Sequence, residues 1–457
     1  MKTIKKSFGF PLLAILSILA SCGDDKTLMI EETEEPVSVT PVTQPTKEEE
    51  KTEKQESTVT LPKTRLTLTD EQMRNIAPGN DFTFRYFDKA IKTHEFGSED
   101  KGDYVTYDVY NLLLSPLSVQ FTLGMLGNYV KCDEALSTML GFDKADINSV
   151  NNYFKTIIGD LTGSDAKGLS IANALMRDSL SIPFKEDFIN VIKDNYSIDY
   201  LCFEAKPLSE LPQGKRPEDD WVREKTSGMI EEAPFPILPE KYALFNTLCF
   251  KGEWVDKFDA KNTKEATFYR DGNVLTLNMM HRKGNCLYYK GVNYSSVSLP
   301  MNDNAFMMTV LLPDLNSSFA DITGQLNSKN WESLRKGMSS HMIDLFLPKF
   351  DVSFAHSHLF DLLDENYKKE YSDEINRMYE EDPEHTHIFN KIAQNTVFKV
   401  DENGASAAAA TQAGMVGSDK PSETIVFNAN RPFVYVISDS GSGLVLFIGV
   451  FSGKEGK

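Results

Sequence analysis

The strongest constraint on this chain is a stretch of small residues between two strand-like segments. Residues 402–411 read Glu-Asn-Gly-Ala-Ser-Ala-Ala-Ala-Ala-Thr. Alanine has the highest helix propensity, so a helix is the simplest interpretation, and a low-complexity loop is the next. The flanks fit a helix poorly, because residues 398–402 alternate like a strand and another strand-like segment begins at Ile425. A loop this long between two strands of a compact domain is uncommon and usually functional.

The negative charge of the chain is concentrated near its beginning. The formal net charge is −19 over 457 residues, and residues 23–62 alone hold 11 Asp/Glu against 4 Lys/Arg. This segment contains no aromatic residue, so it cannot bury enough apolar area to offset the entropy cost of ordering. We therefore expect a disordered acidic tether over residues 23–70 and one domain over 71–457. Nucleic-acid binding requires a basic face, so the charge argues against that class of partner.

The first 22 residues predict export and lipid attachment. Lysines precede an apolar run over residues 8–20, which is about 20 Å long as a helix and too short to span a bilayer. Leu19-Ala20-Ser21-Cys22 resembles a bacterial lipobox, which makes Cys22 the lipidated mature N-terminus; the alternative is an ordinary signal peptide with a chance cysteine. We expect an exported lipoprotein on the outer membrane or cell surface, held by its N-terminal lipid only. The acidic pair Asp24-Asp25 fits either a surface-export signal or a further part of the solvated tether.

The rest of the chain predicts a single mixed domain of the α+β class. Ser115-Pro116 supplies an N-cap and a first-turn proline for a helix through residue 126. Helices come early and strands late, which favours α+β over regular βαβ alternation. The further predicted helices cover residues 133–140 and 184–196, and the predicted strands cover 306–312, 343–350, 397–400, 433–437 and 444–451.

The sequence carries no recognisable catalytic motif. Nucleophile elbows, zinc-protease motifs, phosphate-binding glycine loops and Cys-x-x-Cys pairs are all missing from it. We therefore expect no enzyme activity, no metal and no cofactor. Cys132, Cys202, Cys249 and Cys286 are interpreted as small buried hydrophobes, with a disulfide among them left open.

Several ordered motifs resemble one family. Residues 402–411 are similar to the hinge of the reactive-centre loop of serpins, the serine protease inhibitor superfamily, and the resemblance extends over residues 80–453. It implies an α+β serpin fold, with helices clustered on three β-sheets and an exposed reactive-centre loop. The other motifs that carry it are Asn111–Ser118, Trp221–Ile230, Asn246–Trp254, Leu347–Phe350, Arg431–Phe433 and Leu446–Gly449.

The resemblance implies a suicide-substrate inhibitor of secreted serine endopeptidases. A protease attacks the loop, and the cleaved loop inserts as a new central strand before the acyl-enzyme hydrolyses. No charge or proline lies between Gly404 and Ser418, and alternate residues from Ala405 to Met415 are small or apolar, as an inserting strand requires. A strand over residues 402–418 would be about 55 Å long. The implied hinge consists of Glu402, Gly404, Ala405, Ser406, Ala407, Ala408, Ala409, Ala410 and Thr411.

The resemblance also implies two groups of supporting residues. Ser115, Ser118, Asn246 and Gln394 would form the polar cluster, or shutter, beneath the opening sheet. Trp254, Lys349 and Glu402 would mark the breach where the loop first enters, with Lys349 and Glu402 paired. Gln394 stands where the family often has histidine; its amide can donate and accept, so the network is expected to survive without pH sensitivity.

The resemblance implies a scissile bond at Ser418-Asp419, with the bonds after Met415, Val416 and Gly417 as open alternatives. Met415 and Val416 suit elastase-like or subtilisin-like pockets, and a cysteine protease remains an alternative target because the trap acts on any acyl-enzyme. The competing hypothesis is a non-inhibitory serpin that serves as a surface binding or structural lipoprotein. We expect a monomer in either case.

Overall fold

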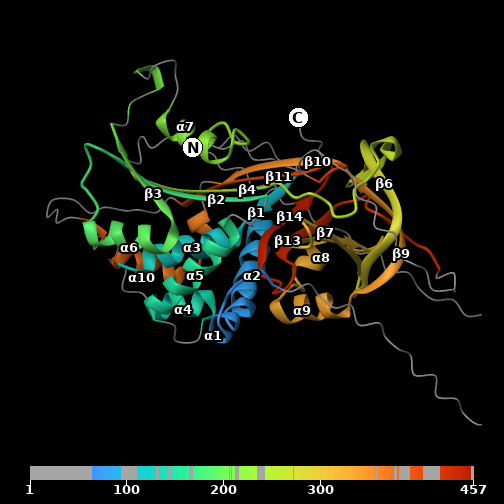
Figure 1. The fold of residues 1–457 in the computed structure, drawn as a ribbon, viewed down its shortest axis with the longest axis horizontal. Helices are drawn as coiled ribbons and strands as arrows, with labels where there is room; N and C mark the ends of the chain where they lie inside the picture. The colour runs from blue at the N-terminus through green and yellow to red at the C-terminus, as the bar shows by residue number, and fades with distance from the viewer. Residues whose placement is uncertain are drawn as a thin grey trace, which may run out of the picture. The chain divides into compact units, whose positions relative to one another are not determined.

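The residues that the computed structural model describes all belong to one compact unit of the chain, drawn in Figure 1. Among the described residues, no helix is long and apolar enough to cross a membrane. The described residues are 64–93, 111–129, 133–142, 146–163, 168–204, 206, 208–210, 216–233, 242–270, 272–356, 359–374, 378–379, 392–404 and 423–453.

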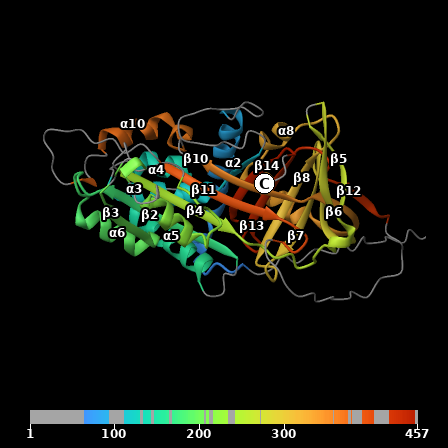
Figure 2. The same ribbon diagram turned by 90° about the horizontal axis from the view of Figure 1, so that it is seen from above.

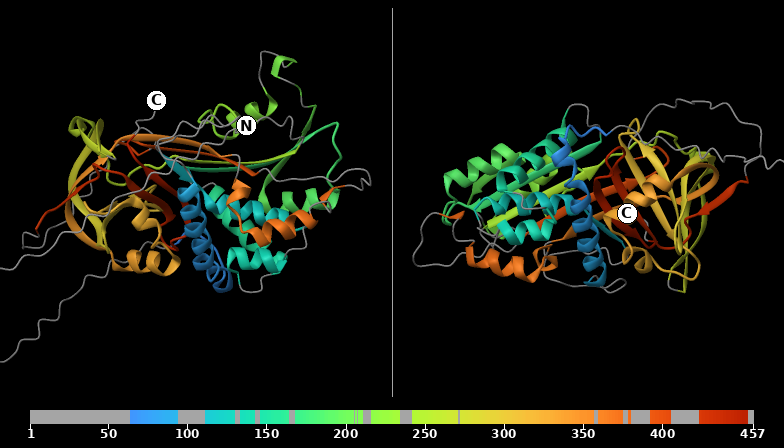
Figure 3. Two further views of the ribbon diagram at one scale, coloured as in Figure 1. Left: turned by 180° about the vertical axis from the view of Figure 1, so that it is seen from behind. Right: turned by 90° about the horizontal axis from the view of Figure 1, so that it is seen from below.

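Most of the helices gather on one side of a five-stranded sheet, as Figures 1 and 3 show. The α-helices are α1 (Asp70–Met73), α2 (Ile76–Thr93), α3 (Pro116–Gly127), α4 (Asp133–Leu140), α5 (Ile147–Thr162), α6 (Glu186–Tyr196), α7 (Pro217–Lys225), α8 (Phe319–Thr323), α9 (Ser328–Gly337) and α10 (Glu365–Glu374). The 3-10 turns are η1 (Leu208–Glu210), η3 (Ala260–Asn262) and η4 (Leu359–Leu362).

The strands form two hydrogen-bonded sheets. The nine-stranded sheet has the order β1-β14-β13-β8-β7-β6-β9-β12 with β5 paired to β6, and the five-stranded sheet has the order β10-β11-β4-β2-β3. The strands are β1 (Leu112–Leu114), β2 (Leu169–Asp178), β3 (Ile198–Phe203), β4 (Tyr242–Phe250), β5 (Lys264–Arg270), β6 (Asn273–Lys290), β7 (Tyr294–Met301), β8 (Phe306–Pro313), β9 (Ser339–Pro348), β10 (Phe350–His356), β11 (Ile392–Val400), β12 (Ile425–Asn428), β13 (Phe433–Asp439) and β14 (Val445–Phe451).

The α+β class is confirmed, but the expected three sheets appear as two hydrogen-bonded units. The reason is the length of β6, which has 18 residues. Its first part pairs with β5, its last residues pair with β7, and β9 runs along it from Met279 to Tyr288. One continuous strand therefore joins two layers that would otherwise count as separate sheets.

Helix α3 lies at the centre of the domain. All twelve of its residues are buried, because it packs against α2, α4, α5 and both sheets. The predicted start at Ser115-Pro116 is confirmed, but the predicted side-chain cap is wrong. The Ser115 hydroxyl instead donates to the Leu446 carbonyl at 2.7 Å, because β14 passes directly beside it.

The five-stranded sheet is covered on both faces at its centre. Trp221 and Val222 of α7 pack against Phe245 of β4 and Ala393 of β11 in a second hydrophobic cluster. Every residue of β4 is consequently buried. Figure 2 shows β10, β11, β4 and β2 side by side from above.

The other element predictions mostly agree with the structure. Helix 133–140 and the hairpin of β13 and β14 are confirmed. The predicted strand over 343–350 is instead two strands, β9 and β10, because the chain leaves one sheet after Pro348 and enters the other at Phe350. Lys349 therefore stands at the corner between the sheets.

Residues 64–69, which fall within the predicted tether, contact the domain. Leu66 is buried in the main core, and Thr64 donates to Asp439 Oδ2 at 2.9 Å. The Thr67 backbone N–H donates to Asp160 Oδ2 at 2.5 Å. The packed part of the chain therefore begins before the predicted boundary at residue 71.

Candidate functional site

The centre of the five-stranded sheet is a parallel pair, β4 and β11. The pairing runs from Ile392 opposite Leu244 to Phe398 opposite Phe250. Because the two strands are parallel, β11 ends beside the end of β4, and the loop after Gly404 starts there. If that loop turned back between them, it would run antiparallel to both neighbours.

This topology favours the insertion of another strand into the sheet. Parallel ladders are slightly less stable per residue than antiparallel ladders. A strand inserted between β4 and β11 would replace one parallel ladder with two antiparallel ones. The β2–β3 pair of this sheet is also parallel, but the loop starts beside the shared end of β4 and β11, so the β4–β11 gap is the one that the loop can reach directly.

A buried polar cluster closes this gap on the side of α3. Gln394 Oε1 accepts from the Ser115 backbone N–H at 2.8 Å, and Gln394 Nε2 donates to the Ser115 carbonyl at 2.9 Å. The Ser118 hydroxyl donates to the Ser115 hydroxyl at 3.0 Å. One amide thus satisfies both backbone groups at the start of α3, and all three residues are fully buried.

Asn246 belongs to a second network, although the resemblance places it with the two serines. It lies opposite Gln394 in register, but its Nδ2 donates to Asn173 Oδ1 of β2 at 2.6 Å. Asn173 Nδ2 in turn donates to the Tyr196 carbonyl at 3.1 Å. Asn246 Oδ1 is buried without a hydrogen-bond partner among the described residues. The expected single cluster is therefore two clusters, one on each side of the β4–β11 gap.

Two polar residues of β11 beside the gap were not predicted. Thr396 Oγ1 donates to the Leu113 carbonyl at 2.9 Å, and Asn395 Nδ2 donates to the Glu232 carbonyl at 2.9 Å. The signal that could have found them is the run Gln394-Asn395-Thr396, which is polar in the middle of an otherwise apolar strand.

The chain after β11 is fastened to the segment that follows β4. Trp254 Nε1 donates to the Asp401 carbonyl at 2.8 Å, and the Trp254 N–H donates to the Asn403 carbonyl at 3.1 Å. The Phe258 N–H donates to the Glu402 carbonyl at 2.9 Å. These bonds fix the start of the loop at the open end of the β4–β11 gap, where the sequence places the breach.

The expected ion pair is present at this point. Lys349 Nζ lies 3.0 Å from Glu402 Oε2, and Thr263 Oγ1 donates to Glu402 Oε1 at 2.8 Å. Burial by itself raises the pKa of Glu402, but hydrogen bonds from its own backbone, Thr263 and Lys349, with the charge of Lys349, leave it below its usual value. Glu402 is therefore ionised at neutral pH and tied to the corner residue between the sheets.

Gly404 ends the fastened segment in a conformation that requires glycine. Its φ is +100°, and it exchanges two backbone hydrogen bonds with Asp401, each 3.1 Å long. A Cβ at this position would lie 2.1 Å from the Gly252 carbonyl oxygen and 2.5 Å from Glu253 Cα. The turn therefore holds the loop start against the segment after β4 only because residue 404 has no side chain.

The remaining predicted site residues lie outside the described residues. They are the lipidation residue Cys22, the hinge residues Ala405, Ser406, Ala407, Ala408, Ala409, Ala410 and Thr411, and the scissile residues Met415, Val416, Gly417, Ser418 and Asp419.

Three of the four domain cysteines are free. Cys202 is exposed, whereas Cys249 and Cys286 are buried, and Cys132 lies outside the described residues. Burial raises the pKa of the Cys249 thiol to about 12. The interpretation as buried hydrophobes therefore holds for Cys249 and Cys286 and is wrong for Cys202, which lies on the edge strand β3.

Comparison with known proteins agrees with this geometry. The family model described as Serpin (serine protease inhibitor) matches residues 79–453, so the chain belongs to the serpin family. Antichymotrypsin-2 of Bombyx mori is 27% identical over 390 residues, covering 82% of this chain and 96% of the relative. Antithrombin-III of Ovis aries is 26% identical over 381 residues, covering 80% of this chain and 79% of the relative.

Solved structures share the fold. The thermophilic serpin tengpin in its native state matches with a TM-score of 0.69 and 24% identity, covering 87% of this chain and 98% of that structure. Members of the serpin family are mostly protease inhibitors and not catalytic enzymes. The class of partner that the family generally targets is the serine proteases.

Proposed function

We propose that this chain inhibits secreted serine endopeptidases as a suicide substrate, by inserting its cleaved loop between β4 and β11. The observation that carries the proposal is the parallel β4–β11 pair, whose shared end holds the start of the loop through Trp254, Glu402 and Gly404. The composition of residues 405–417, without charge or proline, suits a strand that must pass between two others.

The unreacted state would be held by kinetics. Insertion requires Gln394 to part from the β4 side of the gap and the breach hydrogen bonds to open, while the inserted state gains two antiparallel ladders. The protease would be carried on the acyl-enzyme from one end of the sheet toward the other before hydrolysis. Any protease that forms an acyl-enzyme could be trapped, so cysteine proteases are a second target class.

We also propose the cellular setting. Cys22 would carry the lipid, and the acidic segment after it would tether a monomeric inhibitor to the outer membrane or cell surface. The experiment is metabolic labelling with a radioactive fatty acid, with Cys22→Ser as the control variant. Equal labelling of both chains, or no labelling of either, would reject Cys22 as the anchor.

Complex formation tests the inhibition proposal directly. The protein is incubated with pancreatic elastase, neutrophil elastase, subtilisin and papain, and covalent complexes that survive SDS are expected with at least one of them. Mass mapping of the released peptide then locates the scissile bond within residues 415–419. If every protease only cleaves the loop, the chain is a non-inhibitory serpin and the binding or structural role gains support.

A matched pair of hinge variants tests insertion. In an inserted strand, Ala409 faces the core and Ala408 faces outward, because side chains alternate. Ala409→Asp should therefore convert the inhibitor into a substrate, while Ala408→Asp should still form complexes. Equal behaviour of the two variants would contradict insertion as a strand.

A further inference from the structure

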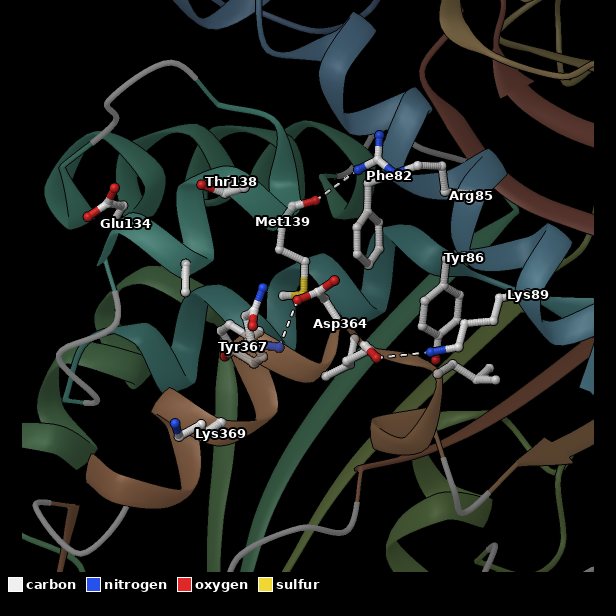
Figure 4. A pocket seen from close by; sticks show the side chains of 14 residues that line it. Phe82, Arg85, Tyr86, Lys89, Glu134, Thr138, Met139, Asp364, Tyr367 and Lys369 are labelled. Carbon is white, nitrogen blue, oxygen red and sulfur yellow. Dashed lines mark hydrogen bonds between the residues drawn. The ribbon is translucent and has the colours of Figure 1, made fainter.

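A pocket of about 850 Å³ lies between α2, α4 and the η4–α10 segment, and none of the breach or shutter residues lines it. Figure 4 shows Phe82 and Tyr86 projecting into it from α2, opposite Tyr367 of α10. Its floor is apolar and buried, since the floor residues Phe82, Tyr86, Met139, Leu363 and Tyr367 are each at most 8% exposed. Its volume is in the range of small-molecule sites.

Cations gather at the rim of this pocket. Arg85 and Lys89 are four residues apart on α2 and so share one face of that helix, and Lys369 stands on the α10 side. Within the described part of the chain, none of the three forms an ion pair with a carboxylate. Arg85 Nη2 and Lys89 Nζ donate instead to the carbonyls of Met139 and Leu363, each at 3.0 Å. A guanidinium carries five N–H donors and an ammonium three, so both retain donors for a ligand.

Two acidic side chains line the pocket, and among the described residues neither forms an ion pair with Arg85 or Lys89. Burial and the nearby Asp361 carboxylate raise the pKa of Tyr86 on the same helix. Asp364 caps α10 by accepting from the Asn366 backbone N–H at 2.8 Å, and Glu134 lies on α4. An unpaired cationic pair above an apolar floor is unusual in a chain whose net charge is −19. A ligand with one anionic head group and an apolar body complements this arrangement.

We propose that this pocket binds an anionic amphiphile of the fatty-acid class. The carboxylate would lie between Arg85 and Lys89, and the alkyl chain would cover Phe82, Met139 and Tyr367. Neither the serpin mechanism nor the breach and shutter residues use this pocket, so the binding claim is independent of the proposed function.

The position of α10 links the pocket to the sheet. The η4–α10 segment connects β10 to β11, the two strands on one side of the gap, whereas α2 and α4 pack around α3. A ligand that bridges α10 to α2 and α4 would tie the β10–β11 side of the sheet to the central helices. We therefore expect bound ligand to slow loop insertion; this consequence rests on the proposed function.

Calorimetric titration of the full chain with sub-micellar decanoate tests the site. One-to-one binding is expected, with affinity rising about fourfold per methylene from octanoate to dodecanoate. Decanol and decyltrimethylammonium should bind up to about 25-fold more weakly than decanoate, because each of the two exposed ion pairs contributes a factor of up to about five. No saturable binding, or equal binding of all three head groups, would overturn the proposal.

Variants locate the ligand. The double variant R85Q/K89Q should weaken decanoate binding about tenfold, whereas K92Q, on the same helix but paired with Asp88 outside the pocket, should not. Thr138 is an exposed lining residue, so T138W fills the pocket without disturbing the core and should abolish binding. Unchanged binding by T138W would place the ligand elsewhere and refute this site.

The expected effect of bound ligand on loop insertion is measured separately from binding. With a protease that forms complexes, saturating decanoate should increase the fraction of protein cleaved without complex formation, and R85Q/K89Q should lose this response. If decanoate binds by calorimetry and the fraction does not change, the coupling is refuted while the site stands. If no protease forms complexes, the proposed function fails and the titration still decides the pocket.

Discussion

Replacing Gly404 by alanine should destabilise the unreacted protein and leave the cleaved, inserted form untouched. In the unreacted structure residue 404 has φ +100°, and an added Cβ would lie 2.1 Å from the Gly252 carbonyl oxygen. An L-residue in the left-handed region costs about 1–2 kcal/mol, and overpacking against backbone adds about 1–3 kcal/mol. In an inserted strand the residue would be extended, so neither cost applies.

The expected shift can be estimated from the size of the domain. A loss of about 2–5 kcal/mol, divided by the unfolding entropy of a domain of about 390 residues, lowers Tm by about 2–6 °C. The assay is differential scanning calorimetry of the intact protein and of the protein cleaved at the loop. Gly272→Ala is the matched control, because Gly272 has φ +80° but nothing within 4 Å of its Cβ position.

Gly272→Ala should lower the Tm of the intact and the cleaved protein by a similar amount, smaller than that expected for intact Gly404→Ala, since only the cost of the left-handed backbone applies. An equal loss of Tm in the intact and cleaved forms of Gly404→Ala would refute the reasoning, because residue 404 would then keep the same turn in both states. An unchanged Tm of the intact Gly404→Ala protein would show that the contact with Gly252 does not restrain the loop.

Three other predictions concern the gap and its surroundings. Gln394→Leu leaves the buried N–H of Ser115 without a partner, while the Ser115 carbonyl keeps the Ser118 N–H at 3.1 Å, so the variant should lose about 1–3 kcal/mol in chemical denaturation. Gln394→Glu at low pH keeps one donor and one acceptor and should recover part of this loss; no difference between the two variants would contradict the role of the amide. The pKa of Glu402 is lowered in the folded protein, so ionised Glu402 contributes to the free energy of unfolding above pH 4.5, and this contribution is lost as the pH falls through the lowered pKa. Glu402→Gln should therefore reduce the dependence of stability on pH below 4.5. An unaltered pH dependence in that range would exclude Glu402 as its source. Among the described cysteines only Cys202 is exposed. In a variant with Cys22 and Cys132 changed to serine, the Cys202 thiol should therefore react quickly with a thiol reagent, and the Cys249 and Cys286 thiols should react only after unfolding. Fast reaction of Cys249 would mean that the sheet opens readily.

The predicted breach shows how far local sequence reasoning reaches. Glu402, Asn403 and Gly404 could be assigned to the loop start because small residues, strand alternation and family motifs are properties of neighbouring residues. The Lys349–Glu402 pair, at 3.0 Å, followed from the same resemblance. The tight packing of Gly404 against Gly252 could not, since it depends on two segments about 150 residues apart.

The shutter shows the opposite case. Ser115, Ser118 and Gln394 meet as expected, but Asn246 bonds to Asn173 on the other side of the gap. Both asparagines are polar residues in apolar strands, and nothing in the neighbouring sequence states which partner each will find. The register of β2 against β4 decides it, because it places residue 173 directly opposite residue 246.

By itself, the sequence determined the α+β class, the helix at Pro116, the terminal hairpin and the small residues of the hinge, since propensity and periodicity act over a few residues. Only the tertiary structure decided that β4 and β11 are parallel neighbours, that Lys349 stands at a corner between sheets and that α2, α4 and α10 enclose a cationic pocket. These features depend on contacts between distant segments, such as Ser115 with Gln394 across 279 positions. Such contacts are fixed by the packing of whole elements.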